Sequence, residues 1–230
     1  MTFIRVIDTE TTGMEPPAEI VEAAYCDVIR SDKGVWSVQR PVSWLCGVKA
    51  IPPEVRAIHH ITMAEVHDAT PFDADDLLAG GPDVLAAHNW DFDSKFIGEV
   101  CMPTICTYKA ALRVWPEAPG HSNGTLRYWL EDRGHLALDH DLAMPPHRAG
   151  PDAYVTAHIL KVLLSVTTAR EMVAWTKEPR LLPTCPLGKF RGFKWADVES
   201  GFLNWMLNQA TMEEDLKWNA RRELENRDAA

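Results

Sequence analysis

The apolar positions of this chain fall into short segments whose spacing predicts an α/β protein. Residues 3–8 are apolar except for Arg5 and a final carboxylate, a pattern typical of a buried strand. Residues 19–29 and 35–45 predict a second and a third strand, and Asp32-Lys33-Gly34 between them is a good hairpin turn. Three strands joined by short turns indicate an antiparallel meander at the start of a sheet.

After residue 50 the spacing of apolar positions becomes helical. Pro52-Pro53 precedes a short helix through Ile58, and Thr62 begins another helix with Glu65 at the capping-box position. Strands are predicted over residues 83–87 and 103–107, and helices over about 91–100, 108–115, 123–132 and 152–166, the last after Pro151. This order predicts a mixed α/β sheet flanked by helices, with antiparallel opening strands followed by parallel strands.

Composition is that of a soluble globular protein. Hydrophobic residues make up 46% and charged residues 24% of the 230 positions. No run approaches the roughly 20 apolar residues that a membrane span needs, and the start lacks an apolar signal segment, so we expect a cytoplasmic protein without a membrane partner. The five cysteines are odd in number and form no C-x-x-C pair, which predicts free thiols and neither disulfides nor a zinc site.

The charge is unevenly distributed along the chain. The net charge of −10 argues against binding of nucleic acid by general electrostatics alone. Residues 1–179 carry 15 Lys/Arg against 25 Asp/Glu, whereas residues 180–230 carry 8 against 8. Pro179, Pro183 and Pro186 mark a boundary. We therefore expect a main domain over residues 1–178 and a small C-terminal appendage over 179–230, with part of the acidic excess serving to bind cations.

The strongest local signal is Asp8-Thr9-Glu10 at the end of the first strand. Residues i and i+2 of a strand point to the same face, so the two carboxylates are expected to project together. Their charges repel unless a cation lies between them, and hard oxygen ligands favour Mg²⁺ or Mn²⁺. A solvent-exposed D-x-E is the simpler alternative, but the apolar run before this pair places it where a buried strand emerges.

Two further segments carry polar groups at the start of predicted helices. In the first, Asn89 suits an N-cap, and Asp93 falls in the first turn, where an acid can also serve merely to stabilise the helix. In the second, Asp152 follows Pro151 in a first turn and His147 lies in the preceding loop, where an inert surface histidine is the alternative. Together with Asp8-Thr9-Glu10, these segments supply what two-metal phosphodiester hydrolysis requires, with a neutral histidine to accept the proton.

The order of these segments resembles the three motifs of the DEDDh 3′–5′ exonuclease superfamily. The motifs are Asp8-Thr9-Glu10-Thr11-Thr12-Gly13, His88-Asn89-x-x-Phe92-Asp93 and His147-Arg148-Ala149-x-x-Asp152. The segment from Ala57 to Thr62 is similar to the loop that these enzymes carry between the first two motifs. The likeness covers about residues 3–170 and implies a ribonuclease H-like fold with five catalytic residues, namely Asp8, Glu10, Asp93, His147 and Asp152.

The resemblance also implies a role for each residue. Asp8, Glu10 and Asp152 would ligate the first of two Mg²⁺ or Mn²⁺ ions, Asp8 would bridge to the second, Asp93 would support that ion through water, and His147 would be the general base. The implied substrate-binding residues are Thr9, Thr11, Thr12, Gly13, Met14, His88, Asn89 and Phe92, with Met14 pressing against a duplex end. Trp90-Asp91 is an unusual pair for the family and leaves substrate preference open.

The C-terminal segment indicates which nucleic acid is the expected substrate. Gly188-Lys189-Phe190-Arg191-Gly192 and Phe202-Leu203-x-Trp205 resemble the tail of the exodeoxyribonuclease X group, as does the segment from Cys106 to Pro116. That group removes 5′-mononucleotides from DNA 3′ ends, single-stranded and duplex. Interleaved basic and aromatic residues suit a nucleic-acid strand, with Lys189 and Arg191 contacting DNA. The alternative is a small satellite core beneath solvated charges.

Two rival functions stay open at this point. One is a 3′–5′ exoribonuclease of the same superfamily, of the oligoribonuclease or tRNA-trimming type. The C-terminal tail argues against it, because its resemblance favours DNA as the substrate. The other is a non-catalytic nucleic-acid-binding or protein-binding domain with a decayed site, against which the five intact positions argue. The oligomeric state, a homodimer included, is not fixed by the sequence.

Overall fold

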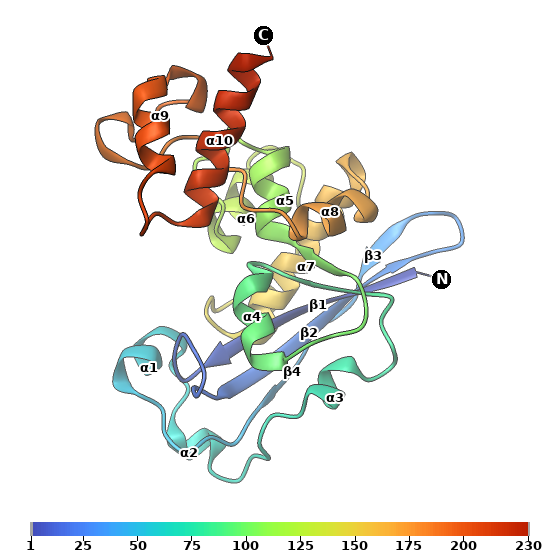
Figure 1. The fold of residues 1–230 in the computed structure, drawn as a ribbon. Coiled ribbons are helices and arrows are strands. Elements are labelled where there is room, and N and C mark those ends of the chain that lie inside the picture. Colours follow the sequence, from blue (N-terminus) through green and yellow to red (C-terminus); the bar gives the residue numbers. More distant parts are fainter. Residues whose placement is uncertain (1, 230) are drawn as a thin grey trace.

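Six strands form one mixed sheet in the computed structural model, which describes residues 2–229 (Figure 1). The order is β3-β2-β1-β5-β6, with β4 also paired to β2. Strands β2, β3 and β4 run antiparallel to their neighbours, whereas β5 and β6 are parallel to β1 and to each other. The bounds are β1 Thr2–Thr11, β2 Ile20–Arg30, β3 Trp36–Val38, β4 Val42–Leu45, β5 Val84–Ala87 and β6 Thr104–Cys106. The predicted antiparallel opening and parallel continuation are confirmed.

The predicted third strand over residues 35–45 is wrong as a single element. It consists of two strands, β3 and β4, that pair with different parts of β2. Pro41 lies in the break between them, and a proline has no N–H with which to continue a ladder. The break leaves β4 opposite the end of β2 that lies nearest Asp8 and Glu10.

Helices cover both faces of the sheet. They are α1 Pro53–His59, α2 Met63–Val66, α3 Ala74–Leu78, α4 Trp90–Ile97, α5 Thr107–Val114, α6 Asn123–Glu131, α7 Ala149–Val166, α8 Ala169–Thr176, α9 Ser200–Leu207 and α10 Glu214–Asp228. Ile4 and Val6 of β1 pack in one cluster with residues of α5, α6, α7 and α8. Ile7 faces the opposite cluster, which includes residues of α3 and α4. Among the described residues, no helix is both long and apolar enough to cross a bilayer.

Helix α7 begins at Ala149, three residues before the predicted start at Asp152, and so includes Pro151. The amides of a helix's first turn have no partner within the helix, so a proline is accommodated there as well as at the first position. Asp152 still lies in the first turn, and its N–H donates to the carbonyl of Arg148 over 3.0 Å. The helix therefore presents Asp152 next to the loop that carries His147.

Residues 179–230, called here the C-terminal module, contain a hydrophobic cluster of their own. Its buried members are Cys185, Phe190, Trp195, Val198, Leu203, Met206, Leu216 and Ala220. Figure 1 shows α9 and α10 lying against each other at the top left, beside α5. Helix α10 is largely charged, and its residues Leu216, Ala220 and Leu224 pack in this cluster.

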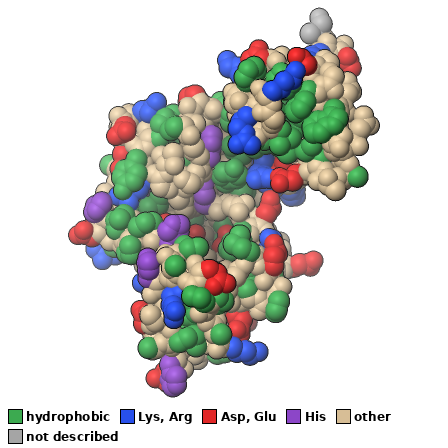
Figure 2. All heavy atoms as spheres, turned by 90° about the vertical axis from the view of Figure 1, so that its left-hand side faces the viewer, with side chains coloured by type: hydrophobic (Ala, Val, Ile, Leu, Met, Phe, Trp, Pro, Cys, Tyr) green, Lys and Arg blue, Asp and Glu red, His purple; other side chains and the backbone are tan. Residues whose placement is uncertain are grey.

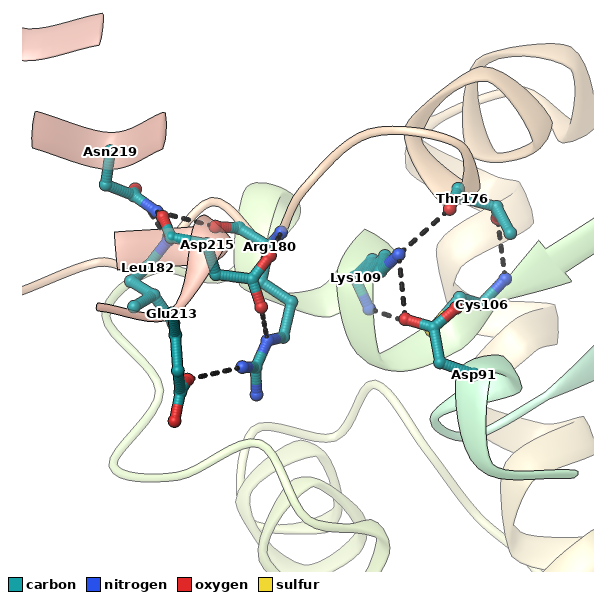
Figure 3. Close-up of polar contacts among 9 residues, drawn as sticks. All are labelled: Asp91, Cys106, Lys109, Thr176, Arg180, Leu182, Glu213, Asp215 and Asn219. Atoms are coloured by element: carbon teal, nitrogen blue, oxygen red, sulfur yellow. Dashed lines mark hydrogen bonds and ion pairs between the residues drawn. The ribbon is translucent and has the colours of Figure 1, made fainter. Parts of the chain in front are cut away.

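The segment that leads into the module is fastened to α10 by side chains (Figure 3). Arg180 forms ion pairs with Asp215 and Glu213. The amide of Asn219 donates to the carbonyl of Arg180 over 2.7 Å, and its oxygen accepts from the N–H of Leu182 over 3.0 Å. The chain therefore enters the module along α10 in an ordered path.

Candidate active site

Three carboxylates meet at the end of β1. Asp8 and Glu10 project from the same face of the strand, as the two-residue period predicts, and Asp152 approaches from the first turn of α7. One oxygen of each side chain lies within 4.8 Å of an oxygen of the other two. The three residues are half-buried, so the cluster is open to ligands while its charges are partly removed from water.

Charge repulsion and burial dominate the electrostatics of this cluster. Burial first, and then Asp152, Asp93 and Glu10, raise the pKa of Asp8 well above its usual range. Burial and the neighbouring carboxylates raise the pKa of Glu10 to about 8. Burial also raises the pKa of Asp152. A divalent cation among these oxygens would relieve the repulsion, and carboxylate oxygens are the ligands that Mg²⁺ and Mn²⁺ prefer, so the donor set fits such an ion.

Asp93 reaches toward the same end of the sheet from the first turn of α4. It is buried, and the hydroxyl of Thr9 donates to its carboxylate over 2.8 Å. Burial raises the pKa of Asp93 to about 7, and its charge contributes to the raised pKa of Asp8. Asp93 is outside the group of three oxygens, at a position that suits a supporting role. The Thr9 side chain, expected to contact substrate, is thus engaged in holding Asp93.

His147 lies in the loop before α7 with an uncommon backbone conformation. Its φ is 59°, in the left-handed region that costs a non-glycine residue of the order of 1 kcal/mol. Its N–H donates to the Asp152 carboxylate over 2.8 Å, while the residue itself is exposed. The structure thus brings His147 and Asp152 together, as the sequence predicted.

A buried ion pair fastens the same loop to the sheet. Glu22 lies opposite Glu10 in the β1–β2 register and is only 3% exposed. Its carboxylate accepts from Arg148 Nε over 2.8 Å, from Arg148 Nη2 over 2.9 Å and from the N–H of Ala149 over 3.0 Å. The sequence reasoning missed this role of Glu22. A carboxylate within the apolar run 20–24 was the available signal, because a buried charge requires a partner.

The residues of the second motif differ in how free their side chains are. His88 Nε2 bonds to the carbonyl of His121 over 2.7 Å, and Nδ1 bonds to the hydroxyl of Thr107 over 2.9 Å. Burial lowers the pKa of His88 to about 4, so its ring is neutral at pH 7 and donates through Nε2. Asn89 occupies the N-cap position, but its exposed side chain makes no capping bond. Phe92 is half-buried. Of these groups, Asn89 has the side chain most available to a ligand.

The turn after β1 uses its threonines internally. The hydroxyl of Thr11 donates to the carbonyl of Gly13 over 2.7 Å, and the hydroxyl of Thr12 accepts from the N–H of Glu19 over 2.9 Å. Met14 follows with 70% of its surface exposed. The threonine side chains therefore shape the turn, and Met14 is the apolar group that it presents to solvent.

The unusual pair Trp90-Asp91 has a structural explanation. Trp90 is buried against the sheet. Asp91 pairs with Lys109 over 3.0 Å, and Lys109 is buried and donates to the carbonyl of Thr176 over 3.0 Å (Figure 3). The pair thus joins α4 to α5 and the end of α8.

Lys189 and Arg191 lie in the C-terminal module, apart from the carboxylate cluster in the fold. Lys189 pairs with Glu199 over 3.2 Å, with both side chains about two-thirds exposed. Arg191 is exposed and forms no ion pair within residues 2–229. Figure 2 shows the module at the upper right, where Lys and Arg side chains lie beside a hydrophobic area.

Comparisons with known proteins agree with this geometry. The profile of the exonuclease family RNase_T matches residues 6–160. Exodeoxyribonuclease 10 from Escherichia coli K12 is 34% identical over 237 aligned residues, which cover 97% of this chain and all of that protein. The solved structure of Exonuclease X in complex with 5′-overhanging duplex DNA has 32% identity and a TM-score of 0.61, covering 75% of this chain and 99% of the other.

A more distant solved structure agrees in fold alone. Cell-death related nuclease 4 (CRN-4) is 14% identical with a TM-score of 0.55, and the match covers 72% of this chain and 64% of that one. The mixed sheet flanked by helices is therefore the ribonuclease H-like fold that the motif order implied.

Proposed function

The chain belongs to the exonuclease family whose profile spans residues 6–160, and on this premise we propose that it is a metal-dependent 3′–5′ exodeoxyribonuclease. Its reaction is the hydrolysis of phosphodiester bonds at DNA 3′ ends, single-stranded and duplex, with release of 5′-mononucleotides. The observation that carries the proposal is the meeting of Asp8, Glu10 and Asp152 at the end of β1. DNA as the polymer is supported by relatives above 30% identity, among them exodeoxyribonuclease 10 from Escherichia coli and Exonuclease X, which was solved in complex with duplex DNA.

Two Mg²⁺ or Mn²⁺ ions would be held by the carboxylates. Asp8, Glu10 and Asp152 would hold the first ion, and Asp8, with support from Asp93 of α4, would also hold the second. When bound, such ions lower the pKa of the attacking water and neutralise charge that develops on the phosphate and leaving oxygens. The raised pKa values of Asp8 and Glu10 support this assignment, because a cation beside these buried, mutually repelling carboxylates would favour their charged forms.

His147 is assigned as the general base. Its exposed position at the rim of the cluster lets the imidazole receive a proton from the attacking water and pass it to solvent. The N–H of the same residue is bound to Asp152, so this hydrogen bond ties the loop of the base to a metal ligand on α7. The Glu22–Arg148 pair fixes the next residue of that loop against β2.

The terminal nucleotide is assigned to the groups around the cluster that remain free. The backbone of residues 9–13, the Asn89 amide and the Phe92 ring would hold it. His88 contributes its ring face, because both of its nitrogens are bonded within the protein. Met14 would press against the last base pair of a duplex. We further propose that residues 1–178 form the catalytic domain and that residues 179–230 contact DNA through Lys189 and Arg191.

The direct test is mononucleotide release from matched DNA and RNA oligomers with Mg²⁺ or Mn²⁺. We expect release from 3′-recessed, blunt and 3′-overhanging DNA, and its abolition by EDTA. Equal or faster release from RNA would assign the enzyme to the exoribonucleases. Unchanged release in EDTA would exclude the metal mechanism.

A further inference from the structure

The C-terminal module carries a row of four aromatic rings in which one middle ring is buried, the other is half-buried, and both ends are exposed. Phe190 lies 5.9 Å from Phe193 and 4.9 Å from Phe202, and Phe202 lies 5.1 Å from Trp205 between ring centroids. Phe190 is 5% exposed, whereas Phe193 is 49% and Trp205 47% exposed. The module's own core therefore fixes the row and leaves an aromatic side chain in solvent at each end.

Basic side chains lie near Phe193 in this row, and the segment that contributes Phe190 and Phe193 has no acidic residue. Residues 179–196 include no Asp or Glu. Arg191 and Lys194 flank Phe193, both are exposed, and neither has a carboxylate partner within residues 2–229. The main body has ten more acids than bases, so it repels a polyanion except where metal ions bind. The module offers positive charge that is not already neutralised.

We propose that this surface, formed by Phe193, Trp205, Arg191 and Lys194, binds single-stranded DNA. The inference rests on the proposed function, which makes DNA the substrate, and adds where an unpaired strand is held. An aromatic ring can stack on a base only when the base face is free, which favours a single strand over a duplex. The unpaired cations match the phosphates that such a strand would bring with it.

The comparisons leave this surface unassigned. The solved Exonuclease X chain is matched over 99% of its length, and that match covers 75% of this chain. The exonuclease profile ends at residue 160, before the module begins. Binding by the module would hold the unpaired part of a substrate while its 3′ end is processed at the carboxylate cluster, so its effect falls on substrate affinity.

The experiment compares shape-matched variants of the full chain in EDTA, where cleavage is absent and binding alone is measured. The double variant Phe193→Leu/Trp205→Leu keeps apolar volume but removes the rings, whereas Phe193→Tyr/Trp205→Phe keeps a ring at both positions. Fluorescence anisotropy with 5′-labelled oligo(dT) and with a blunt duplex of equal length reports the affinities. Thermal unfolding by circular dichroism checks that each variant is folded.

We expect the leucine pair to weaken oligo(dT) binding by about tenfold or more, the aromatic pair to stay within about twofold of wild type, and duplex binding to be unaffected. Oligo(dT) affinity that the leucine pair leaves unchanged would overturn the proposal, as would an equal loss for duplex. If the surface instead binds a second copy of the chain, sedimentation would show a wild-type dimer that the leucine pair dissociates, and that result also refutes it. Loss of DNA hydrolysis by the wild type in Mg²⁺ would refute the proposed function and leave this binding result standing.

Discussion

Removal of the Arg148 side chain tests how the loop that carries His147, the proposed general base, is held. Arg148 and Glu22 form a bidentate ion pair, and their side chains are 31% and 4% exposed, respectively. Breaking a fully buried pair on one side costs about 3–5 kcal/mol, since the remaining charge has no partner. Because water reaches the guanidinium here, we expect Arg148→Ala to lower the free energy of unfolding by the smaller amount of about 2–3 kcal/mol.

The same change should slow catalysis beyond its effect on stability. His147 is held at a φ of 59° by its bond to Asp152 and by the anchored residue that follows it. Without the anchor, the loop can relax to a lower-energy backbone and move the imidazole away from the reacting water. We expect kcat to fall by about 10–100-fold, which corresponds to about 1.4–2.8 kcal/mol, with a smaller change in KM. The kcat of Arg148→Lys should lie between those of Arg148→Ala and wild type, because lysine keeps the positive charge but cannot form the bidentate hydrogen bonds of a guanidinium.

Urea unfolding and steady-state mononucleotide release with saturating Mn²⁺ measure the two effects. Glu22→Gln completes a double-mutant cycle with Arg148→Ala, and the two changes should be strongly non-additive. Arg170→Ala, which removes an exposed arginine from the start of α8, is the matched control and should behave as wild type. An Arg148→Ala enzyme with wild-type kcat and stability within about 0.5 kcal/mol would refute the anchor.

Three further changes test other parts of the site. With EDTA present, the pKa of Glu10 is about 8 in the folded protein and 4.5, its ordinary value, in the unfolded chain. Between these two pH values folding binds a proton, so the free energy of unfolding should fall as the pH rises from 4.5 to about 8. Glu10→Gln should flatten this dependence and be about 1–2 kcal/mol more stable than wild type at pH 8 in urea melts. Asp91→Asn, which weakens the pair with Lys109, should cost about 1 kcal/mol in the same melts without altering the ratio of DNA to RNA hydrolysis. Met14→Ser should slow blunt-duplex hydrolysis at least about threefold while single-strand rates stay unchanged, since an apolar contact with the terminal pair is worth of the order of 1 kcal/mol.

Local rules were sufficient for much of the site. The two-residue period of a strand placed Asp8 and Glu10 on one face, and helix-start signals placed Asp93 and Asp152 in first turns. Each of these inferences needs only neighbours in the chain. The order of the motifs then indicated the fold, which brings the end of β1 and the first turns of α4 and α7 together.

What the sequence did not reveal depends on contacts between distant residues. Glu22 and Arg148 are 126 positions apart, and nothing local to either one names the other as its partner. The third strand divides because its two halves pair with different parts of β2, and the role of Asp91 depends on Lys109 of α5, which lies near it only in the folded chain. Side-chain availability, as for His88, likewise follows from tertiary bonds.

The most direct test of the central claim is mononucleotide release from a 3′-recessed DNA duplex in Mg²⁺ by the Asp8→Ala variant. Asp8 is assigned to both metal ions, so its removal should lower the rate by about 1,000-fold or more, equivalent to about 4 kcal/mol, in a protein whose thermal unfolding shows that it is folded. Retention of wild-type, Mg²⁺-dependent release by this variant would contradict the claim that the carboxylate cluster at the end of β1 is the catalytic centre.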